Sequence, residues 1–274
     1  MAVRIAVLYN PTIPEAHGWA ERAAAIVRGD LFTEPPEAGR IVVVGGDGTI
    51  HAVANARPGA EIAIVPCGSG NDFVKTLGIP CDAESALRLI AGPARPVDVV
   101  EYECAPGRRG RYLNIAEVGF GARVVAHAAK LRKVTGRRMS YRLGIVTALA
   151  GHRLSPITLD IDGRRVGEYL MTNLIVANGQ YFGSGMRPMP DARPDDGLLD
   201  IAILNEFGRW KILSQAKVLR SGLPKNHQKI HHFRGREVRV TSPAEVAVEA
   251  DGEVLGNIPA CFRVIPHGLR VVCP

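Results

Sequence analysis

The stretch from Val42 to Thr49 constrains the fold more than any other part of the chain. It reads Val-Val-Val-Gly-Gly-Asp-Gly-Thr, so an apolar, β-branched run stops abruptly at a glycine-rich turn. A short run of this kind is typical of a buried parallel strand, and the residues from Thr49 to Asn55 predict a helix that begins at once. Glycine lacks a Cβ atom, so the turn can adopt positive φ and bring backbone N–H groups close to a ligand. A strand, a glycine turn and a helix N-terminus together predict an anion site, with phosphate as the expected ligand.

A second stretch repeats this arrangement further along the chain. The apolar run Ile62–Val65 is followed by Pro-Cys-Gly-Ser-Gly-Asn-Asp, and a helix is predicted to open at Asn71 or Asp72. Loops at the carboxyl ends of adjacent parallel strands face one crevice, so we expect the two loops to hold different parts of one nucleotide. Neither is a P-loop, because the pattern G-x-x-x-x-G-K-[ST] is absent. For the first loop, the alternative is an ordinary βα turn in which Asp47 caps the helix.

Composition favours a soluble two-domain enzyme. The chain has 274 residues and 46% hydrophobic content, which is enough to bury sizeable cores and exceeds the usual length of one domain. No apolar run approaches the roughly 18–20 residues that a membrane span needs, and the beginning of the chain lacks the features of a signal peptide. The five cysteines are scattered without a C-x-x-C pair, which argues against a disulfide framework and a zinc site. We therefore expect a cytoplasmic protein.

Strand and helix patterns alternate in the first third of the chain and then change. Strands are predicted at 3–9, 41–44 and 62–65, and helices at 19–28, 49–56, 71–77 and 83–91, which indicates a parallel sheet. Gly92-Pro93-Ala94-Arg95-Pro96 breaks this pattern. The alternating segments that follow predict antiparallel strands at 97–104, 111–117, 157–161, 167–177, 198–204, 238–241, 246–249 and 262–265, with helical stretches around 120–151 and 207–221. A last strand is predicted at 269–272. Residues 1–96 and 97–268 are therefore predicted as an α/β domain and a β-rich domain.

Residues 45–49 resemble the GGDGT signature shared by diacylglycerol kinase-type lipid kinases, NAD kinases and phosphofructokinases. Four further stretches resemble the lipid-kinase branch, at 68–73, 114–122, 195–200 and 251–253. The resemblance extends over nearly the whole chain. It implies an α/β N-terminal nucleotide-binding domain of the NAD kinase-like kind and a larger β-sandwich-like C-terminal domain, with the active site between them. It also implies that the last strand, within 269–274, returns to the first domain.

The resemblance implies an ATP- and Mg²⁺-dependent kinase that phosphorylates a hydroxyl of diacylglycerol or a related lipid. The residues expected to bind ATP lie in the first-strand turn, the two glycine loops and the helix after the first loop: Asn10, Gly45, Gly46, Asp47, Gly48, Thr49, His51, Gly68, Ser69, Asn71 and Asp72. Family members have a further strand and helix where only Gly29 to Gly39 intervenes here, so one wall of the adenine–ribose pocket is expected to be missing or rebuilt. A soluble-substrate kinase of the NAD-kinase type and a catalytically weak lipid- or nucleotide-binding homologue are the alternatives.

Phosphoryl transfer needs positioning, charge neutralisation and a group that accepts the proton of the acceptor. Asp47 can orient its loop and approach the metal–phosphate cluster. The resemblance places the general base in the turn Asp251-Gly252-Glu253, although Asp-Gly is also a strong signal for an ordinary hairpin turn. The sequence does not distinguish Asp251 from Glu253 as the base.

A structural metal site is implied in the acidic, turn-prone stretch 190–198. By the resemblance, Asp196 binds Mg²⁺ together with the backbone carbonyls of Arg193 and Leu198, and carboxylate and carbonyl oxygens suit this hard cation. A capped turn before a strand is the alternative.

Two segments, 118–159 and 207–236, each contain eight basic residues and no acidic residue. Together they hold sixteen of the 34 Lys and Arg and account for the net charge of +7. Solvated helix faces are one explanation, and an anionic membrane surface is the functional alternative. Nucleic acid is not an expected partner, because aromatic residues make up only 5% of the chain and no binding motif is present. We therefore expect a peripheral association with membranes and leave a homodimer open. The basic residues include Lys130, Arg132, Lys133, Arg137, Arg138 and Arg142 in the first segment, and Arg209, Lys211, Lys217, Arg220, Lys225 and Lys229 in the second.

Overall fold

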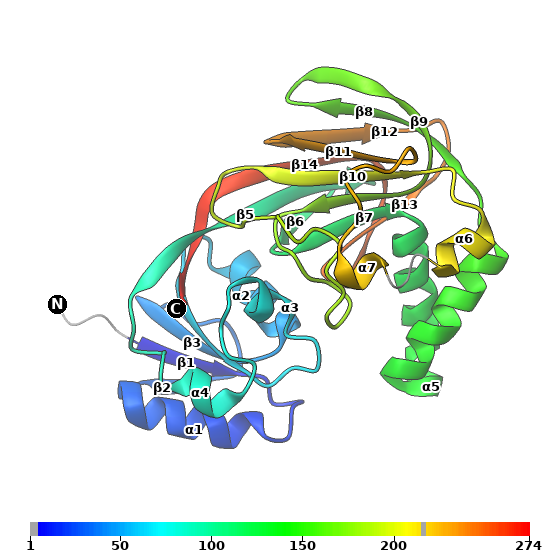
Figure 1. The fold of residues 1–274 in the computed structure, drawn as a ribbon. Helices are drawn as coiled ribbons and strands as arrows, with labels where there is room; N and C mark the ends of the chain where they lie inside the picture. Colours follow the sequence, from blue (N-terminus) through cyan, green and yellow to red (C-terminus); the bar gives the residue numbers. More distant parts are fainter. Residues whose placement is uncertain (1–4, 215–217) are drawn as a thin grey trace.

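The computed structural model describes residues 5–214 and 218–274. The chain begins with a parallel sheet of β1 (Ile5–Tyr9), β2 (Asp30–Phe32), β3 (Arg40–Gly45) and β4 (Glu61–Pro66), in the order β4-β3-β1-β2. Helices α1 (Ala16–Val27) and α4 (Ala83–Leu87) cover one face, and α2 (Asp47–Ala56) and α3 (Asp72–Thr76) cover the other (Figure 1). Because both faces are buried, the central strands are apolar after the charged residues Arg40 and Glu61, which begin β3 and β4.

The segment between α1 and β3 contains a strand that the sequence pattern does not reveal. β2 pairs in parallel with β1, with Ala6 opposite Asp30. The remainder of the segment runs to β3 without a helix and is fastened to the end of α2, because Arg57 donates hydrogen bonds to the carbonyl oxygens of Pro35 at 2.8 Å and Pro36 at 3.0 Å. The segment therefore contains a short strand but no helix, and the expectation that this wall of the pocket is missing or rebuilt stays a prediction. A strand of three residues is too short to show a period in the sequence.

The rest of the chain is dominated by antiparallel strands. They are β5 (Ala94–Ala105), β6 (Arg108–Tyr112), β7 (Ile115–Gly119), β8 (Ser155–Ile161), β9 (Arg164–Ala177), β10 (Leu199–Asn205), β11 (Ile230–Gly235), β12 (Glu237–Thr241), β13 (Ala247–Ala250) and β14 (Glu253–Val272). β7, β9, β8, β12, β14 and β13 pair in a closed ring around an apolar core that includes Leu174 and Phe262. The predicted combination of an α/β domain with a larger β-sandwich-like domain is confirmed.

Two long strands join the two parts of the molecule (Figure 1). β5 runs antiparallel to β14, and the last residues of β14 pair in parallel with β4, with Arg270 opposite Glu61. The predicted strands 262–265 and 269–272 are therefore segments of one strand, which bulges between Ile265 and Leu269. All fourteen strands of residues 5–214 and 218–274 belong to one continuous sheet. This continuity fixes the loops after β3 and β4 relative to the turn between β13 and β14.

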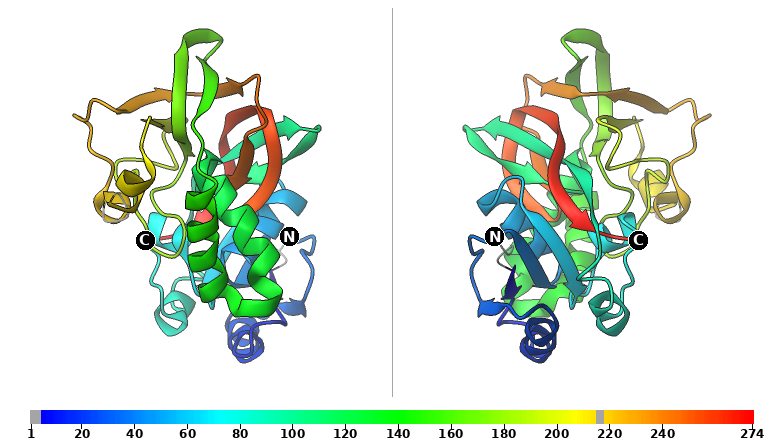
Figure 2. Two further views of the ribbon diagram at one scale, coloured as in Figure 1. Left: turned by 90° about the vertical axis from the view of Figure 1, so that its right-hand side faces the viewer. Right: turned by 90° about the vertical axis from the view of Figure 1, so that its left-hand side faces the viewer.

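The predicted helix at 120–151 is a helical hairpin. α5 (Phe120–Ala150) reverses at Gly136, whose φ is 70°, and its two arms lie side by side (Figure 2). A Cβ atom on Gly144 would lie 2.7 Å from the carbonyl oxygen of Val124 in the other arm, so glycine permits this close approach. The predicted stretch 207–221 contains α6 (Arg209–Ser214) and α7 (Val218–Ser221), while its part at 215–217, with Lys217, lies outside the described residues. Across residues 5–214 and 218–274, no helix combines the length and apolar character needed to cross a membrane.

Candidate active site

The two glycine loops touch each other at the carboxyl ends of β3 and β4. The Cys67 N–H donates to the carbonyl oxygen of Gly45 at 2.8 Å, and a Cβ atom on Gly46 would lie 2.9 Å from the Cα atom of Gly68. A Cβ atom on Gly45 would lie 2.7 Å from the Cβ atom of Thr49. Larger residues at these positions would force the backbones apart. The loops therefore lie side by side, as their positions on neighbouring parallel strands predict.

The loop glycines serve this close approach and not a left-handed backbone. No glycine between residues 45 and 70, apart from Gly59 in another loop, has positive φ, so the expectation that positive φ is used here is wrong. One non-glycine residue of the second loop does have positive φ: Asn71, with φ 53°, which precedes α3. Gly48 is already helical, and a Cβ atom there would meet no described atom within 4 Å. The first turn of α2 is therefore open on this side, where a phosphate could approach its N–H groups.

Asp47 connects the two loops. Its Oδ1 accepts a hydrogen bond from the Phe73 N–H of α3 at 3.1 Å. The Asp47 carboxylate therefore caps α3 and not α2, the helix that Asp47 begins. The Oγ1 atom of Thr49 accepts from the Nδ2 atom of Asn10 at 3.4 Å, and Asn10 Oδ1 in turn accepts from the Thr12 N–H at 3.0 Å. The turn after β1 is thereby held against the start of α2.

The second loop carries buried oxygen atoms that lack a protein donor. Asn71 and Asp72 are 8% and 7% exposed, and the Oδ1 atom of each accepts no hydrogen bond from the described residues. Asp72 Oδ2 accepts from the Ser184 N–H at 2.8 Å, and its Oδ1 lies 3.6 Å from the Lys75 ammonium. Burial raises the pKa of Asp72, and the nearby Asp47 carboxylate adds to the rise. Amide and carboxylate oxygens of this kind suit Mg²⁺. Ser69 is exposed in the same loop.

The turn between β13 and β14 is built around the Asp251 carboxylate. Asp251 Oδ2 accepts from the Leu113 N–H at 2.8 Å, and Oδ1 accepts from the N–H groups of Asn114 and Ile115 at 3.1 and 3.2 Å. Asp251 itself has a φ of 48°, which is uncommon for a residue with a side chain. Burial raises the pKa of Asp251, whereas the three N–H donors and the nearby His51 oppose that rise. The carboxylate is thus fixed in one orientation.

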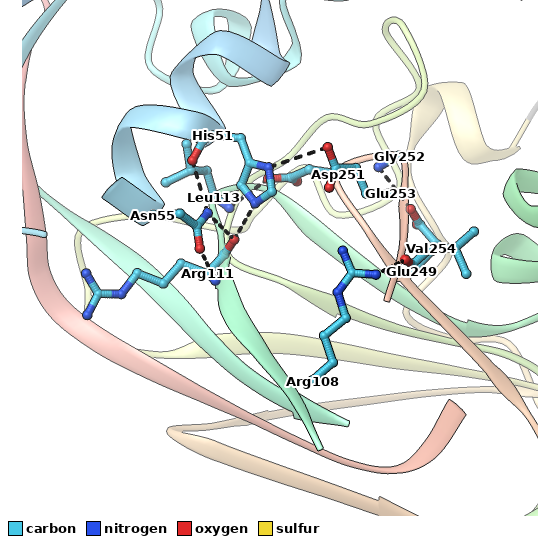
Figure 3. A network of polar contacts seen from close by, with 10 residues as sticks. All are labelled: His51, Asn55, Arg108, Arg111, Leu113, Glu249, Asp251, Gly252, Glu253 and Val254. Carbon is cyan, nitrogen blue, oxygen red and sulfur yellow. Dashed lines mark hydrogen bonds and ion pairs between the residues drawn. The ribbon is translucent and has the colours of Figure 1, made fainter. Parts of the chain in front are cut away.

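His51 joins α2 to this turn (Figure 3). Its Nε2 atom lies 2.5 Å from the carbonyl oxygen of Arg111, and its Nδ1 atom lies 3.9 Å from Glu253 Oε1. Asn55, one helical turn later, donates to the same carbonyl at 3.1 Å and accepts from the Arg111 N–H at 2.8 Å. The Glu253 side chain is 53% exposed. The helix that starts in the first glycine loop therefore packs directly against the elements that carry Asp251 and Glu253.

The stretch predicted to bind a structural Mg²⁺ is held together by a guanidinium group. Asp196 Oδ1 accepts from the Leu198 N–H at 3.1 Å, and Oδ2 is ion-paired with Arg234, which also lies 3.1 Å from Asp200 Oδ1. The exposed Arg193 pairs with Asp195 at 3.6 Å. Within the described part of the chain, no group of three or more His, Cys, Asp or Glu is arranged for a metal. The residues around Asp196 do not fit a divalent cation, because Arg234 already supplies the positive charge, and we assign no metal to this loop.

Comparison with known proteins agrees with this geometry. Residues 6–102 match the family model described as the diacylglycerol kinase catalytic domain, and residues 114–273 match the YegS C-terminal NAD kinase beta sandwich-like domain. A Pseudomonas aeruginosa protein named probable lipid kinase YegS-like is 34% identical over 241 residues, covering 85% of this chain and 76% of that protein. A Mycobacterium tuberculosis protein named diacylglycerol kinase is 28% identical over 241 residues, with the same coverage of both chains.

Solved structures share the fold at low sequence identity. The crystal structure of a diacylglycerol kinase from Bacillus anthracis is 19% identical with a TM-score of 0.72, covering 100% of this chain and 98% of that chain. An NAD kinase from Archaeoglobus fulgidus in complex with ATP is 16% identical with a TM-score of 0.56, covering 98% and 93%. With the two family matches and the relatives above, the chain belongs to the diacylglycerol kinase-type family of lipid kinases.

Proposed function

We propose that this protein transfers the γ-phosphate of ATP to a hydroxyl group of diacylglycerol or a related lipid. The observation that carries the proposal is that one helix joins the two halves of the site. α2 opens in the first glycine loop at Asp47, and four residues later His51 contacts the turn of Asp251 and Glu253. Four residues span about 6 Å along a helix axis. A phosphate at the loop and an acceptor hydroxyl at the turn would thus be neighbours.

The residues divide the chemistry between them. The backbone N–H groups of the glycine loops hold the phosphates, and Asp47, Asn71 and Asp72 would hold Mg²⁺, which would neutralise phosphate charge. The acceptor oxygen attacks the γ-phosphorus, the bond to the β–γ bridging oxygen breaks, ADP leaves, and the hydroxyl proton passes to a carboxylate of the turn.

We assign the base to Asp251 because its carboxylate is fixed by three N–H donors. Its Oδ2 atom accepts only one of these hydrogen bonds, so a lone pair remains for the proton. Glu253 is exposed, and its Oε1 atom lies 3.9 Å from the Nδ1 atom of His51, so it is the less oriented of the two carboxylates. A fixed base loses little freedom when the substrate reacts.

Phosphate transfer to defined acceptors tests the proposal. Labelled ATP and Mg²⁺ are incubated with the protein and with vesicles of diacylglycerol, with other hydroxylated lipids, or with NAD. We expect label in a lipid product, and its identity reports the substrate. Label in NAD alone would instead identify a soluble-substrate kinase. ATP binding without transfer to any acceptor would identify a nucleotide-binding homologue.

The α5 hairpin supports action at an anionic membrane surface. Four of the seven exposed large hydrophobic side chains recorded for the described residues lie on it, from 37% to 87% exposed: Val134, Met139, Leu143 and Val146. Lys130, Arg132 and Arg142 are exposed on the same hairpin. Apolar side chains among basic ones are typical of helices that lie in the membrane interface. We propose that this hairpin docks the protein peripherally.

Vesicle binding tests the docking proposal. Arg132→Glu is expected to weaken binding to anionic vesicles, and added salt should do the same to the wild type, because the attraction is screened over about 10 Å at 0.1 M salt. Arg88→Glu, at an exposed position beside α4, is the matched control and should bind like the wild type. Activity on a soluble short-chain lipid should survive in both variants. If Arg132→Glu and Arg88→Glu bind vesicles equally well, α5 does not contact the membrane.

A further inference from the structure

Two buried glutamates lie directly behind the turn that carries Asp251. Glu117 on β7 and Glu249 on β13 are opposite each other in the antiparallel ladder, and they are 5% and 2% exposed. Their side chains share a hydrogen bond. Two ionised carboxylates cannot stay in such contact inside a protein, so one of them must hold a proton.

Among the side chains that the structure describes, the pair has no basic partner to take the place of that proton. Glu117 and Glu249 point toward α5, where a Cβ atom on Gly121 would collide with the Glu117 carboxylate. In the part of the chain that the structure describes, the titratable groups that face the pair are Tyr141 from α5, Tyr112 from β6 and Asp251 from the turn. None of these three is a cation at neutral pH. The pair is therefore stable only while protonated.

The pair lies within a chain of hydrogen bonds that ends at the turn. Glu249 Oε2 accepts from the N–H of Gly252 at 2.9 Å, and Gly252 separates Asp251 from Glu253 (Figure 3). At the other end, Glu117 Oε1 accepts from Asn173 Nδ2 at 2.6 Å, and Asn173 Oδ1 accepts from the Gly121 N–H at 3.0 Å. The first turn of α5 is thus connected through Asn173 and the two glutamates to the backbone of the turn.

We propose that Glu117 and Glu249 are positioning residues for phosphoryl transfer, which hold the Asp251–Glu253 turn in place through a proton that they share. This inference rests on the proposed function, since it assumes that the turn supplies the base. When the shared proton is lost, two buried like charges repel across β7 and β13, and the acceptor for the Gly252 N–H moves. The base is then displaced from the acceptor hydroxyl, while the nucleotide loops, which belong to other strands, are unaffected.

A pair of substitutions at position 249 tests the proposal in a lipid phosphorylation assay. Glu249→Gln keeps an oxygen for the Gly252 N–H and an N–H₂ group for Glu117, so it should preserve kcat at pH 7. Glu249→Leu has a similar volume but neither group, and should lower kcat by about 10²-fold, the scale of a 1 Å displacement in an active site. The KM for ATP should stay unchanged in both variants.

The pH profile separates positioning from general structural support. In the wild type, kcat should fall at alkaline pH as the pair loses its shared proton, whereas Glu249→Gln should keep its activity there because its amide still donates a hydrogen bond to the Glu117 carboxylate after Glu117 ionises. Wild-type kcat in Glu249→Leu, or the same alkaline fall in wild type and Glu249→Gln, would overturn the proposal. If the leucine variant does not fold, the profile of the glutamine variant decides.

A measurement without lipid keeps the two proposals distinguishable. If the wild type phosphorylates no acceptor, the proposed function fails. The shared proton can then still be tested by the stability of wild type and Glu249→Gln against urea between pH 5 and 9. The wild type should lose stability relative to the variant as the pH rises. Parallel curves would show that the two glutamates share no proton and would overturn the inference independently of catalysis.

Discussion

Replacing Gly48 by alanine is expected to have opposite effects on the free and the ATP-bound protein. Gly48 lies in the first turn of α2, its φ is not positive, and a Cβ atom there meets no described atom within 4 Å. Alanine is favoured over glycine in a helix by about 0.8–1 kcal/mol. Without ligand, the free energy of unfolding of Gly48→Ala should therefore rise by up to about 1 kcal/mol.

ATP should reverse this order. A ligand present at 100 times its Kd stabilises a protein by about 2.7 kcal/mol. If the open side of Gly48 is where the phosphates approach the backbone, the added methyl group occupies that space and the stabilisation is lost. At such an ATP–Mg²⁺ concentration the wild type should then be more stable than Gly48→Ala by about 1.7 kcal/mol.

Urea unfolding followed by circular dichroism, with and without ATP–Mg²⁺, measures both effects. Gly46→Ala is the control, because its Cβ atom would lie 2.9 Å from the Cα atom of Gly68 and should lower stability whether or not ATP is present. If Gly48→Ala gains the full stabilisation from ATP, the phosphates do not approach α2 at this position, and the assignment of the first loop is refuted.

Three further predictions concern charged groups. Burial raises the pKa of Glu117 from 4.5 to about 7, so the folded protein binds this proton more tightly than the unfolded chain does. The stability that results is fully present below about pH 4.5. It decreases by about 3 kcal/mol as the pH rises to about 7. The free energy of unfolding, measured with urea, should be lower at pH 8 than at pH 5 in the wild type, and Glu117→Gln should lack this decrease. An equal decrease in both proteins would contradict the prediction. Arg234→Met leaves Asp196 and Asp200 without their partner and should cost about 1 kcal/mol of stability. Mg²⁺ should change the Tm of wild type and of Asp196→Ala by the same amount, and a rise in the wild type that disappears in Asp196→Ala would restore the metal site at Asp196.

The glycine loops could be predicted from the sequence because their signals are local. A buried strand, a glycine turn and a helix start follow one another within a few residues, as they do at Gly45–Thr49. Parallel strands place such loops at one edge of the sheet, so the contact between Gly46 and Gly68 follows from the order of the elements. The conformation of the glycines could not be read in this way, because close approach and positive φ both require glycine.

The other features depend on residues that are distant in the sequence. Residues 111–117 read as one strand, but the chain breaks into β6 and β7 at Leu113–Asn114, whose N–H groups bond to Asp251. Leu113 and Asp251 are 138 positions apart. Likewise, nothing in the sequence around Asp196 indicates that Arg234 of β11 lies beside it.

The pair of Glu117 and Glu249 is hidden for the same reason. Each residue occupies an alternating strand pattern, and only the register of β7 against β13 brings the two carboxyl groups together. A buried glutamate without a local partner is the one signal that could have drawn attention to either position.

The rate of phosphate transfer from ATP to diacylglycerol by Asp251→Asn, compared with wild type, tests the central claim most directly. Asparagine keeps one oxygen that can accept the hydrogen bonds of the Asn114 and Ile115 N–H groups, but its amide cannot accept the proton of the hydroxyl. The proposed site predicts that kcat falls by about 10²–10⁴-fold, the usual effect of losing a general base, while the affinity for ATP is unchanged. Transfer at the wild-type rate would contradict the assignment of Asp251 and of the turn as the acceptor side of the site.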